Sequence, residues 1–378
     1  MVTTHPPETE TERRRPLVRR RTAAATPEDR LAALGCAVSA ALLSWFVLHV
    51  LLVSPGWPAD LAVGYLLFLG MLYLVTRDRL GRLAAMDKLV STVVFTGALG
   101  LLLPLLFLLA YVVAEGAPNL RLNFFTEDMS TAGPSDPATA GGGAHAIVGT
   151  LQQTGITLLF VVPLGLLTAI FLNETRSRFR KPVRIFVDAM SGLPSIIAGL
   201  FVYAALIIPN VQRGVAFLSY NGVMATLALT MIMLPTVTRT VDVVLRLVPD
   251  GLREASLALG ASRARTVWSV VLPTARTGVT TAVILGVARV VGETAPLLFT
   301  SYGLTLMNAN PFAGAQESLP LFVYRYVQQP VEAVQQRGYV GALVLILLIF
   351  TLFALARLVG RDRSKRRTGR VRPRRETR

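Results

Sequence analysis

Residues 89–114 read LVSTVVFTGALGLLLPLLFLLAYVVA, a continuous apolar run without a charged side chain. A helix needs about 20 apolar residues to cross roughly 30 Å of hydrocarbon, so this run is long enough to span a membrane. Its apolar residues are continuous and do not alternate, which predicts a helix and not a barrel strand. Seven further apolar runs accompany it: Leu31–Val53, Trp57–Thr76, Ala146–Leu172, Val183–Pro209, Gly222–Val244, Thr277–Ser301 and Val340–Val359.

The composition agrees with a membrane protein. Of the 378 residues, 53% are hydrophobic and 16% are charged, whereas soluble domains carry about 25% charged residues. We therefore predict an all-α fold, a polytopic membrane helical bundle. Pro58 and Asp60 stand near the start of the run Trp57–Thr76, which leaves open whether this run spans.

Basic residues lie in blocks between the apolar runs. With the N-terminus placed inside, five cytoplasmic segments hold 33 of the 38 Lys and Arg residues: 1–30, 76–88, 173–184, 239–276 and 357–378. Cytoplasmic loops of membrane proteins carry an excess of Lys and Arg. We expect a multi-pass protein of the cell (plasma or inner) membrane with both termini cytoplasmic, and no nucleic-acid partner despite the net charge of +16.

The order of these segments predicts four parts. Residues 1–30 form a disordered basic cytoplasmic arm, and residues 31–88 form an extension with two transmembrane helices and a basic linker. Residues 89–360 are the working unit, and residues 361–378 are a basic cytoplasmic tail. The outside segments 115–145 and 302–336 are either plain connectors or a landing surface for a partner.

The sequence contains few residues in patterns that are typical of catalytic, metal-binding or nucleotide-binding sites. Cys36 is the one cysteine, and the three histidines lack metal-ligand spacing. A phosphate-binding loop of the form Gly-x-x-x-x-Gly-Lys-Ser/Thr does not occur. We expect no catalytic residue, no metal and no cofactor, and any ATP hydrolysis would take place on a separate subunit.

The cytoplasmic loop between the sixth and seventh runs has a distinct pattern. Residues 249–273 read PDGLREASLALGASRARTVWSVVLP. Apolar residues at helical spacing predict one helix over Leu252–Leu259, ended by Gly260, and a second short helix that ends at Pro273. Such a loop either packs on the membrane face or is gripped by a soluble partner.

The run Thr277–Ser301 contains two charged residues, Arg289 and Glu293. They stand four apart, so on one helix they share a face and can pair. Charges at membrane depth are costly and usually face the bundle interior or a water-filled path. They are therefore either a structural ion pair or part of an anion pathway. Gly278, Ala282 and Gly286 form a small-residue stripe that would let another helix approach closely.

The run Val183–Pro209 is interrupted by Pro194, which removes a backbone donor and opens the helix. Ser195 beside it either faces a pathway or accompanies a simple packing kink. Arg184 and Asp188, four apart near the cytoplasmic end, are expected to pair with each other.

The loop at 249–273 resembles the EAA motif of ABC-importer permeases. Glu254 and Ala255 begin the pattern, Ser256 replaces its third residue with another small one, and Gly260, Val270, Leu272 and Pro273 complete it. The resemblance implies that the residues Glu254, Ala255, Ser256, Gly260, Leu272 and Pro273 dock into an ATP-binding subunit.

Three further segments resemble phosphate-specific permeases of the PstA type: residues 141–151, residues 193–200 and the Ala-Arg-x-x-Gly-Glu-Thr-Ala-Pro segment at 288–296. The resemblance implies a six-helix type I importer core, preceded here by two extra N-terminal helices. It also implies a substrate pathway with Arg289, Glu293, Thr294 and Ser195.

The partners implied by this resemblance are a second permease subunit of the PstC type, a dimer of PstB-type ATP-binding subunits and an extracytoplasmic phosphate-binding protein of the PstS type. Membrane lipid would surround the helices. Two alternatives remain open: a permease for another oxyanion such as sulfate or molybdate, and a membrane scaffold or sensor subunit.

Overall fold

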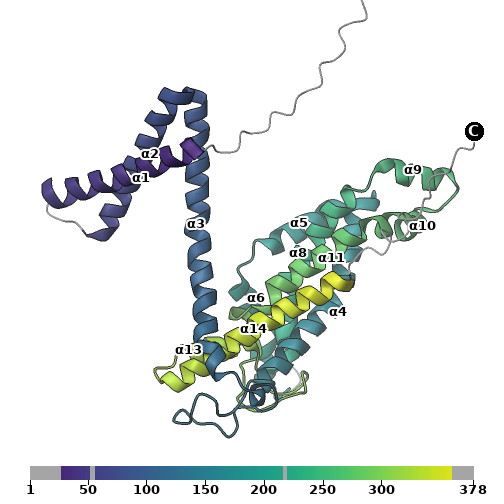
Figure 1. The fold of residues 1–378 in the computed structure, drawn as a ribbon. Coiled ribbons are helices and arrows are strands. Elements are labelled where there is room, and N and C mark those ends of the chain that lie inside the picture. The colour runs from purple at the N-terminus through teal and green to yellow at the C-terminus, as the bar shows by residue number, and fades with distance from the viewer. Residues whose placement is uncertain (1–26, 52–55, 216–218, 360–378) are drawn as a thin grey trace, which may run out of the picture. The chain divides into compact units, whose positions relative to one another are not determined.

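The structure is a computed structural model that describes residues 27–51, 56–215 and 219–359, and these residues are almost entirely helical (Figure 1). Eight helical segments within them are long and apolar enough to cross a membrane: Pro27–Val50, Trp57–Leu80, Arg82–Asn119, Ala144–Glu174, Ser195–Gln212, Gly222–Arg246, Arg263–Val291 and Glu332–Leu358. The predicted polytopic helical fold is confirmed. The chain divides into two compact units, one up to Phe107 and one from Leu108.

The first unit contains α1 (Pro27–Phe46), the π-helical turn η1 (Val47–Leu51), α2 (Trp57–Leu80) and the beginning of α3 (Arg82–Gly116). Helix α1 packs on α2, and the Ser44 hydroxyl donates a hydrogen bond to the Asp60 carbonyl oxygen at 3.0 Å. Helix α2 extends four residues beyond the predicted run, so it is long enough to span in spite of Pro58 and Asp60.

Helix α1 begins earlier than the sequence suggested. Residues 27–30 are helical, which corrects the boundary of the arm predicted over 1–30. Proline is tolerated in the first turn of a helix, and the acidic residues Glu28 and Asp29 favour the positive end of the helix dipole. Residues 1–26 of the predicted arm and the predicted tail at 361–378 lie outside the described residues.

Helix α8 (Gly222–Arg246) is the centre of the second unit. Five helices pack against it: α4 (Ala144–Glu174), α5 (Arg180–Ser191), α6 (Ser195–Val202), α11 (Leu272–Val291) and α12 (Ala295–Thr300). Helix α14 (Glu332–Val359) lies along α11, and α13 (Leu319–Val327) packs on α14. The short elements η2 (Ala117–Asn119), η3 (Leu122–Phe125), η4 (Tyr203–Ile207) and α7 (Ile208–Gln212) complete the connections to α4 and α8.

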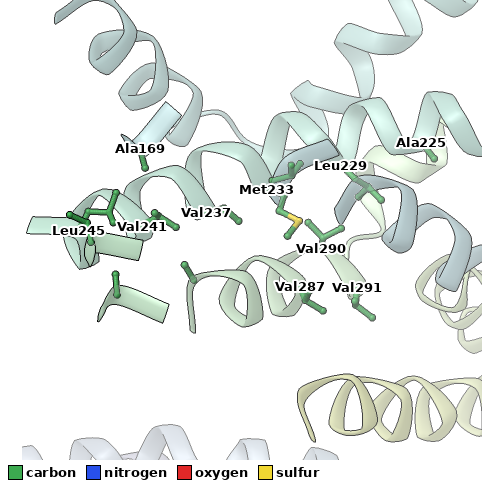
Figure 2. Packing of buried hydrophobic residues seen from close by; sticks show 14 of the residues in the cluster. Ala169, Ala225, Leu229, Met233, Val237, Val241, Leu245, Val287, Val290 and Val291 are labelled. Atoms are coloured by element: carbon green, nitrogen blue, oxygen red, sulfur yellow. The ribbon is translucent and has the colours of Figure 1, made fainter. Parts of the chain in front are cut away.

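The main core lies between α8, α4 and α11. Figure 2 shows Met233 and Val237 of α8 turned toward the segment that carries Val287 and Val290. The predicted small-residue stripe of α11 makes this contact possible. A Cβ at Gly286 would lie 2.6 Å from the Met233 Cε, Ala282 is fully buried, and Gly278 faces the Val244 side chain.

Two predicted spans are not single helices. The run Val183–Pro209 divides into α5 and α6, with a break at residues 192–194, and the π-helical turn η4 follows α6. The run Thr277–Ser301 divides into α11 and α12, with a break at residues 292–294. Hydropathy is insensitive to such breaks because glycine and proline weaken or interrupt a helix while the run as a whole stays apolar.

The second cytoplasmic helix also differs from its prediction. It does not end at Pro273, because α10 (Arg263–Thr266), the π-helical turn η6 (Val267–Val271) and α11 form one continuous helical segment over Arg263–Val291. Pro273 lies inside this segment, two residues after the end of the π-helical turn η6, so the helix continues past the proline by way of an irregular turn.

Candidate functional site

A cluster of polar residues lies where two helix breaks meet. Helix α11 ends at Val291, and the Glu293 N–H donates to the Val290 carbonyl oxygen at 3.1 Å, which closes the last turn. Helix α12 begins at Ala295, four residues after Val291, with Thr294 as its N-cap. Arg289 and Glu293 therefore do not share one helix face, which corrects the expectation from their spacing.

The second break brings Ser195 to the same place. Pro194 is the N-cap of α6, and Ser195 is its first residue. Helix α6 packs on α12 at very short range, because a Cβ at Gly199 would lie 2.5 Å from the Cα of Pro296. The Ser195 hydroxyl is a hydrogen-bond partner of the Glu293 carboxyl.

Arg289 and Glu293 remain electrostatic neighbours. Ser195, Glu293 and Thr294 are half-buried, and Arg289 is exposed within this chain. The site thus combines a cation, a carboxylate and a hydroxyl at two interruptions of apolar helices. Non-helical backbone at membrane depth is tolerated only where it is buried in protein or lines a water-filled cavity. A guanidinium and hydroxyl groups are hydrogen-bond donors of the kind that anions accept from.

The cytoplasmic loop forms a second candidate site. Helix α9 (Asp250–Ala258) follows Pro249 and is terminated by Gly260, whose φ is +81°, as predicted. Glu254 and Ala255 are exposed on α9, whereas Ser256 is half-buried and its hydroxyl lies 2.9 Å from the Thr266 hydroxyl. Leu272 and Pro273 lie at the beginning of α11, at the far end of the same loop. Helices α9 and α10 project beyond the ends of α8 and α11 (Figure 1).

The predicted pair of Arg184 with Asp188 is wrong. Arg184 lies 3.6 Å from Asp242, and Asp188 lies 2.6 Å from Arg239, so both residues of α5 pair with α8. Asp242 also accepts a hydrogen bond from the Asn173 amide at 2.5 Å. The prediction failed because local spacing takes no account of partners on another helix.

Helix α13 and the loops before it lie at the opposite end of this unit (Figure 1). Glu317 and Arg325 form an ion pair there that the sequence did not reveal. The Glu317 carboxylate is 2% exposed and lies 3.5 Å from the Arg325 guanidinium. Burial raises the pKa of Glu317 to about 7, and the charge of Arg325 opposes this shift. Arg325 also donates a hydrogen bond to the Tyr302 carbonyl oxygen.

Hydrogen bonds fasten these loops to one another and to α4. The Gln153 amide donates to the Gln316 side chain at 3.1 Å, and the Met307 N–H donates to Asp128 at 2.7 Å. Hydrogen bonds from Ser130 and Met307 lower the pKa of Asp128 to about 2. The two segments that were predicted to lie outside are therefore folded parts of this unit.

Comparison with known proteins identifies the family. Residues 161–365 match the family described as "Binding-protein-dependent transport system inner membrane component". The chain is 37% identical over 283 residues to "Phosphate transport system permease protein PstA 1" of Mycobacterium tuberculosis (strain CDC 1551 / Oshkosh). The aligned region covers 74% of this chain and 90% of that relative. The chain belongs to this permease family.

A second relative, "Phosphate transport system permease protein PstA" of Pasteurella multocida (strain Pm70), is 32% identical over 283 residues, with 74% of this chain and 96% of that protein covered. Among solved structures, a bacterial alginate ABC transporter in complex with a pentasaccharide-bound periplasmic protein matches with a TM-score of 0.53 at 15% identity. The match covers 75% of this chain and 97% of the matched transporter chain, and it supports the helical membrane fold.

Membership of the family fixes the general role of the chain. It is a multi-span permease subunit of the inner membrane and not an enzyme. It acts together with other components of an ABC transporter, among them a substrate-binding protein.

Proposed function

We propose that this chain is the membrane permease subunit of an ATP-driven importer of inorganic phosphate. The observation that carries the proposal is the meeting of the two helix breaks, which gathers Ser195, Arg289 and Glu293 at one place. The similarity to permeases named for phosphate transport supports the choice of ion.

The chemistry of the cluster suits an oxyanion. A guanidinium stays charged at any physiological pH and offers phosphate a planar fork of donors. The Thr294 hydroxyl would add a neutral donor, and the Ser195 hydroxyl would add another when it releases the Glu293 carboxyl. Glu293 would hold the guanidinium in place and weaken anion binding, which favours transport because the site must release its cargo.

The exposure of Arg289 suggests where the second permease subunit binds. A charged side chain on an apolar helix requires a protein neighbour or water, not lipid. A partner of the PstC type would cover this face and complete the pathway. Membrane lipid would surround the remaining apolar helices, many of whose large side chains are exposed in this chain.

The exposed surface of α9 suggests the site of ATP coupling. A dimer of PstB-type ATP-binding subunits would dock on the loop that carries Glu254, Ala255, Ser256, Gly260, Leu272 and Pro273. Both termini and this loop would then lie in the cytoplasm, as the distribution of Lys and Arg favours. The loops around Glu317 would face a phosphate-binding protein of the PstS type outside.

The mechanism that follows is alternating access. Movement of α9 on ATP binding and hydrolysis would shift α8 and the helices packed on it. The helix breaks at 192–194 and 292–294 would then open toward one side of the membrane at a time. The 89–360 segment would act as the transport domain, with residues 31–88 as an appended extension.

The test is ATP-dependent uptake of labelled phosphate by proteoliposomes that contain the complete complex. We expect unlabelled phosphate to abolish the signal, and sulfate and molybdate at equal concentration to leave it unchanged. Competition by sulfate or molybdate would reassign the cargo to that oxyanion. A complex that assembles but moves none of the three ions would favour a scaffold or sensor subunit.

A further inference from the structure

Helix α9 makes few contacts with the rest of its unit. Of its nine residues, all but Arg253 and Ser256 are exposed. These two residues stand three apart and so lie on the same side of the helix. Ser256 connects α9 to Thr266 of α10. Helix α9 also packs on the π-helical turn η6, which continues into α11. Arg253 connects α9 to α8 and α4.

The Arg253 side chain reaches the ends of two long helices. Its Nη2 donates to the Leu245 carbonyl oxygen in the last turn of α8 at 2.8 Å, and its Nη1 donates at 2.7 Å to the carbonyl oxygen of Val248, two residues beyond the end of α8. Its Nε donates to the Glu174 carboxylate at 3.3 Å, and Glu174 is the last residue of α4. A fourth bond, from Nη1 to Asp250 at 2.9 Å, stays within α9.

These acceptors match a guanidinium, because they carry negative charge or partial negative charge and because one guanidinium has enough N–H groups to reach all of them. The last carbonyl groups of a helix have no partner within the helix, and the negative end of its dipole attracts a cation. Arg253 is positioned at the ends of α8 and α4 together, and its side chain is 17% exposed. One planar fork therefore holds α9 to the two helices that form much of the core.

We infer that Arg253 is a positioning residue that transmits the movement of α9 to α8 and α4. The inference rests on the proposed function, in which an ATP-binding subunit grips the exposed face of α9. Coupling between two sites can be carried by a contiguous network of contacts that both sites bias. Arg253 supplies that network at the point where α9 leaves α8.

The experiment compares Arg253→Gln with the wild-type complex in proteoliposomes. Three quantities are measured: retention of the ATP-binding subunit, stimulation of ATP hydrolysis by phosphate-loaded binding protein, and uptake of labelled phosphate. We expect the subunit and basal hydrolysis to be retained. Stimulation and uptake should fall by about tenfold, because hydrogen bonds from a charged donor are each worth about that factor.

Two further variants separate geometry from charge. Arg253→Lys keeps the charge but loses the fork, so it should recover part of the stimulation. Arg176→Gln is the matched control, because Arg176 is an exposed arginine of the loop that follows α4. It should match the wild type in all three measurements.

The inference is overturned if Arg253→Gln transports and responds to phosphate as the wild type does. It is also overturned if the variant loses the ATP-binding subunit, because Arg253 would then act in docking. If Arg253→Gln does not accumulate in the membrane, the Glu174→Gln variant tests the inference instead. We expect a partial loss of the stimulation of ATP hydrolysis in this variant. Stimulation at the wild-type level would contradict the inference. A wild-type complex that takes up no phosphate contradicts the proposed function instead.

Discussion

Glu317 is a buried carboxylate that lies 3.5 Å from the guanidinium of Arg325. The Ser318 N–H also donates to it at 3.1 Å. These contacts offset only part of the cost of removing the charge from water, so the pKa of Glu317 is raised from 4.5 to about 7. The fold therefore favours the protonated form of this side chain.

The raised pKa of Glu317 predicts a pH-dependent stability. A carboxyl group whose pKa is raised on folding adds to the free energy of unfolding. This stabilisation is fully present below the unfolded pKa of 4.5 and is lost as the pH rises through about 7. The thermal unfolding midpoint of the purified complex should thus fall between about pH 5 and pH 8. The full change in the free energy of unfolding is on the order of 3 kcal/mol.

Glu317→Gln should flatten this pH dependence, since glutamine stays neutral throughout the range. Glu127→Gln is the control, because Glu127 is an exposed carboxylate in a neighbouring loop. Equal pH slopes in the wild type and in Glu317→Gln would show that this carboxyl does not titrate in the assumed way.

Charged residues that pair with distant parts of the chain are hard to find from a sequence. The arginine motif at 288–296 indicated Arg289 and Glu293 because both interrupt an apolar run. Arg253 gave no such signal, since its partner Glu174 is 79 residues away. Arg184 was assigned the wrong partner for the same reason, because Asp242 on α8 is closer than the local Asp188.

At the scale of the elements, apolar length predicted the helices well and the breaks poorly. All eight runs correspond to helical segments among the described residues. The break at Gly292 could have been suspected from glycine, and the break before Ser195 was expected from Pro194. Where the two breaks meet depends on the packing of α6 on α12, which no local pattern contains.

The contact between α11 and α8 predicts a strong effect of a single methyl group. Gly286→Ala should destabilise the unit, because its Cβ would lie 2.6 Å from Met233 and 2.7 Å from Val237. Overpacking of this kind typically costs about 1–3 kcal/mol. The measurement is the thermal unfolding midpoint of the purified protein in detergent.

Gly155→Ala is the matched control for Gly286→Ala. Gly155 also lies inside a long helix, α4, but no atom lies within 4 Å of the position of its Cβ. Its substitution should leave the midpoint unchanged or raise it slightly, since alanine favours helix more than glycine does. Equal midpoints for the two variants would contradict the close packing of α11 on α8.

For the whole molecule, the two compact units raise the question of what the first unit contributes. The family match begins at residue 161, and the M. tuberculosis relative covers 74% of this chain. Helices α1 and α2 precede the helix α3 that starts the working unit. The sequence gives no motif for these two helices, so their purpose could not be predicted.

Removal of residues 1–81 should leave transport intact. The deletion removes two spans, an even number, and Arg82 and Lys88 remain to hold the start of α3 on the cytoplasmic side. Labelled-phosphate uptake, with membrane insertion followed by a C-terminal reporter, is the measurement. Loss of uptake by a truncated chain that still assembles would assign the extension a direct part in transport.

The most direct test of the account is labelled-phosphate uptake by the complex that carries Arg289→Gln, with membrane insertion and subunit assembly measured alongside. Arg213→Gln, at an exposed arginine beyond α7, is the control. The account predicts an intact complex whose uptake falls by about tenfold or more, because a charged donor to the anion is lost. Normal uptake by Arg289→Gln would contradict the account and leave Arg289 as a structural neighbour of Glu293.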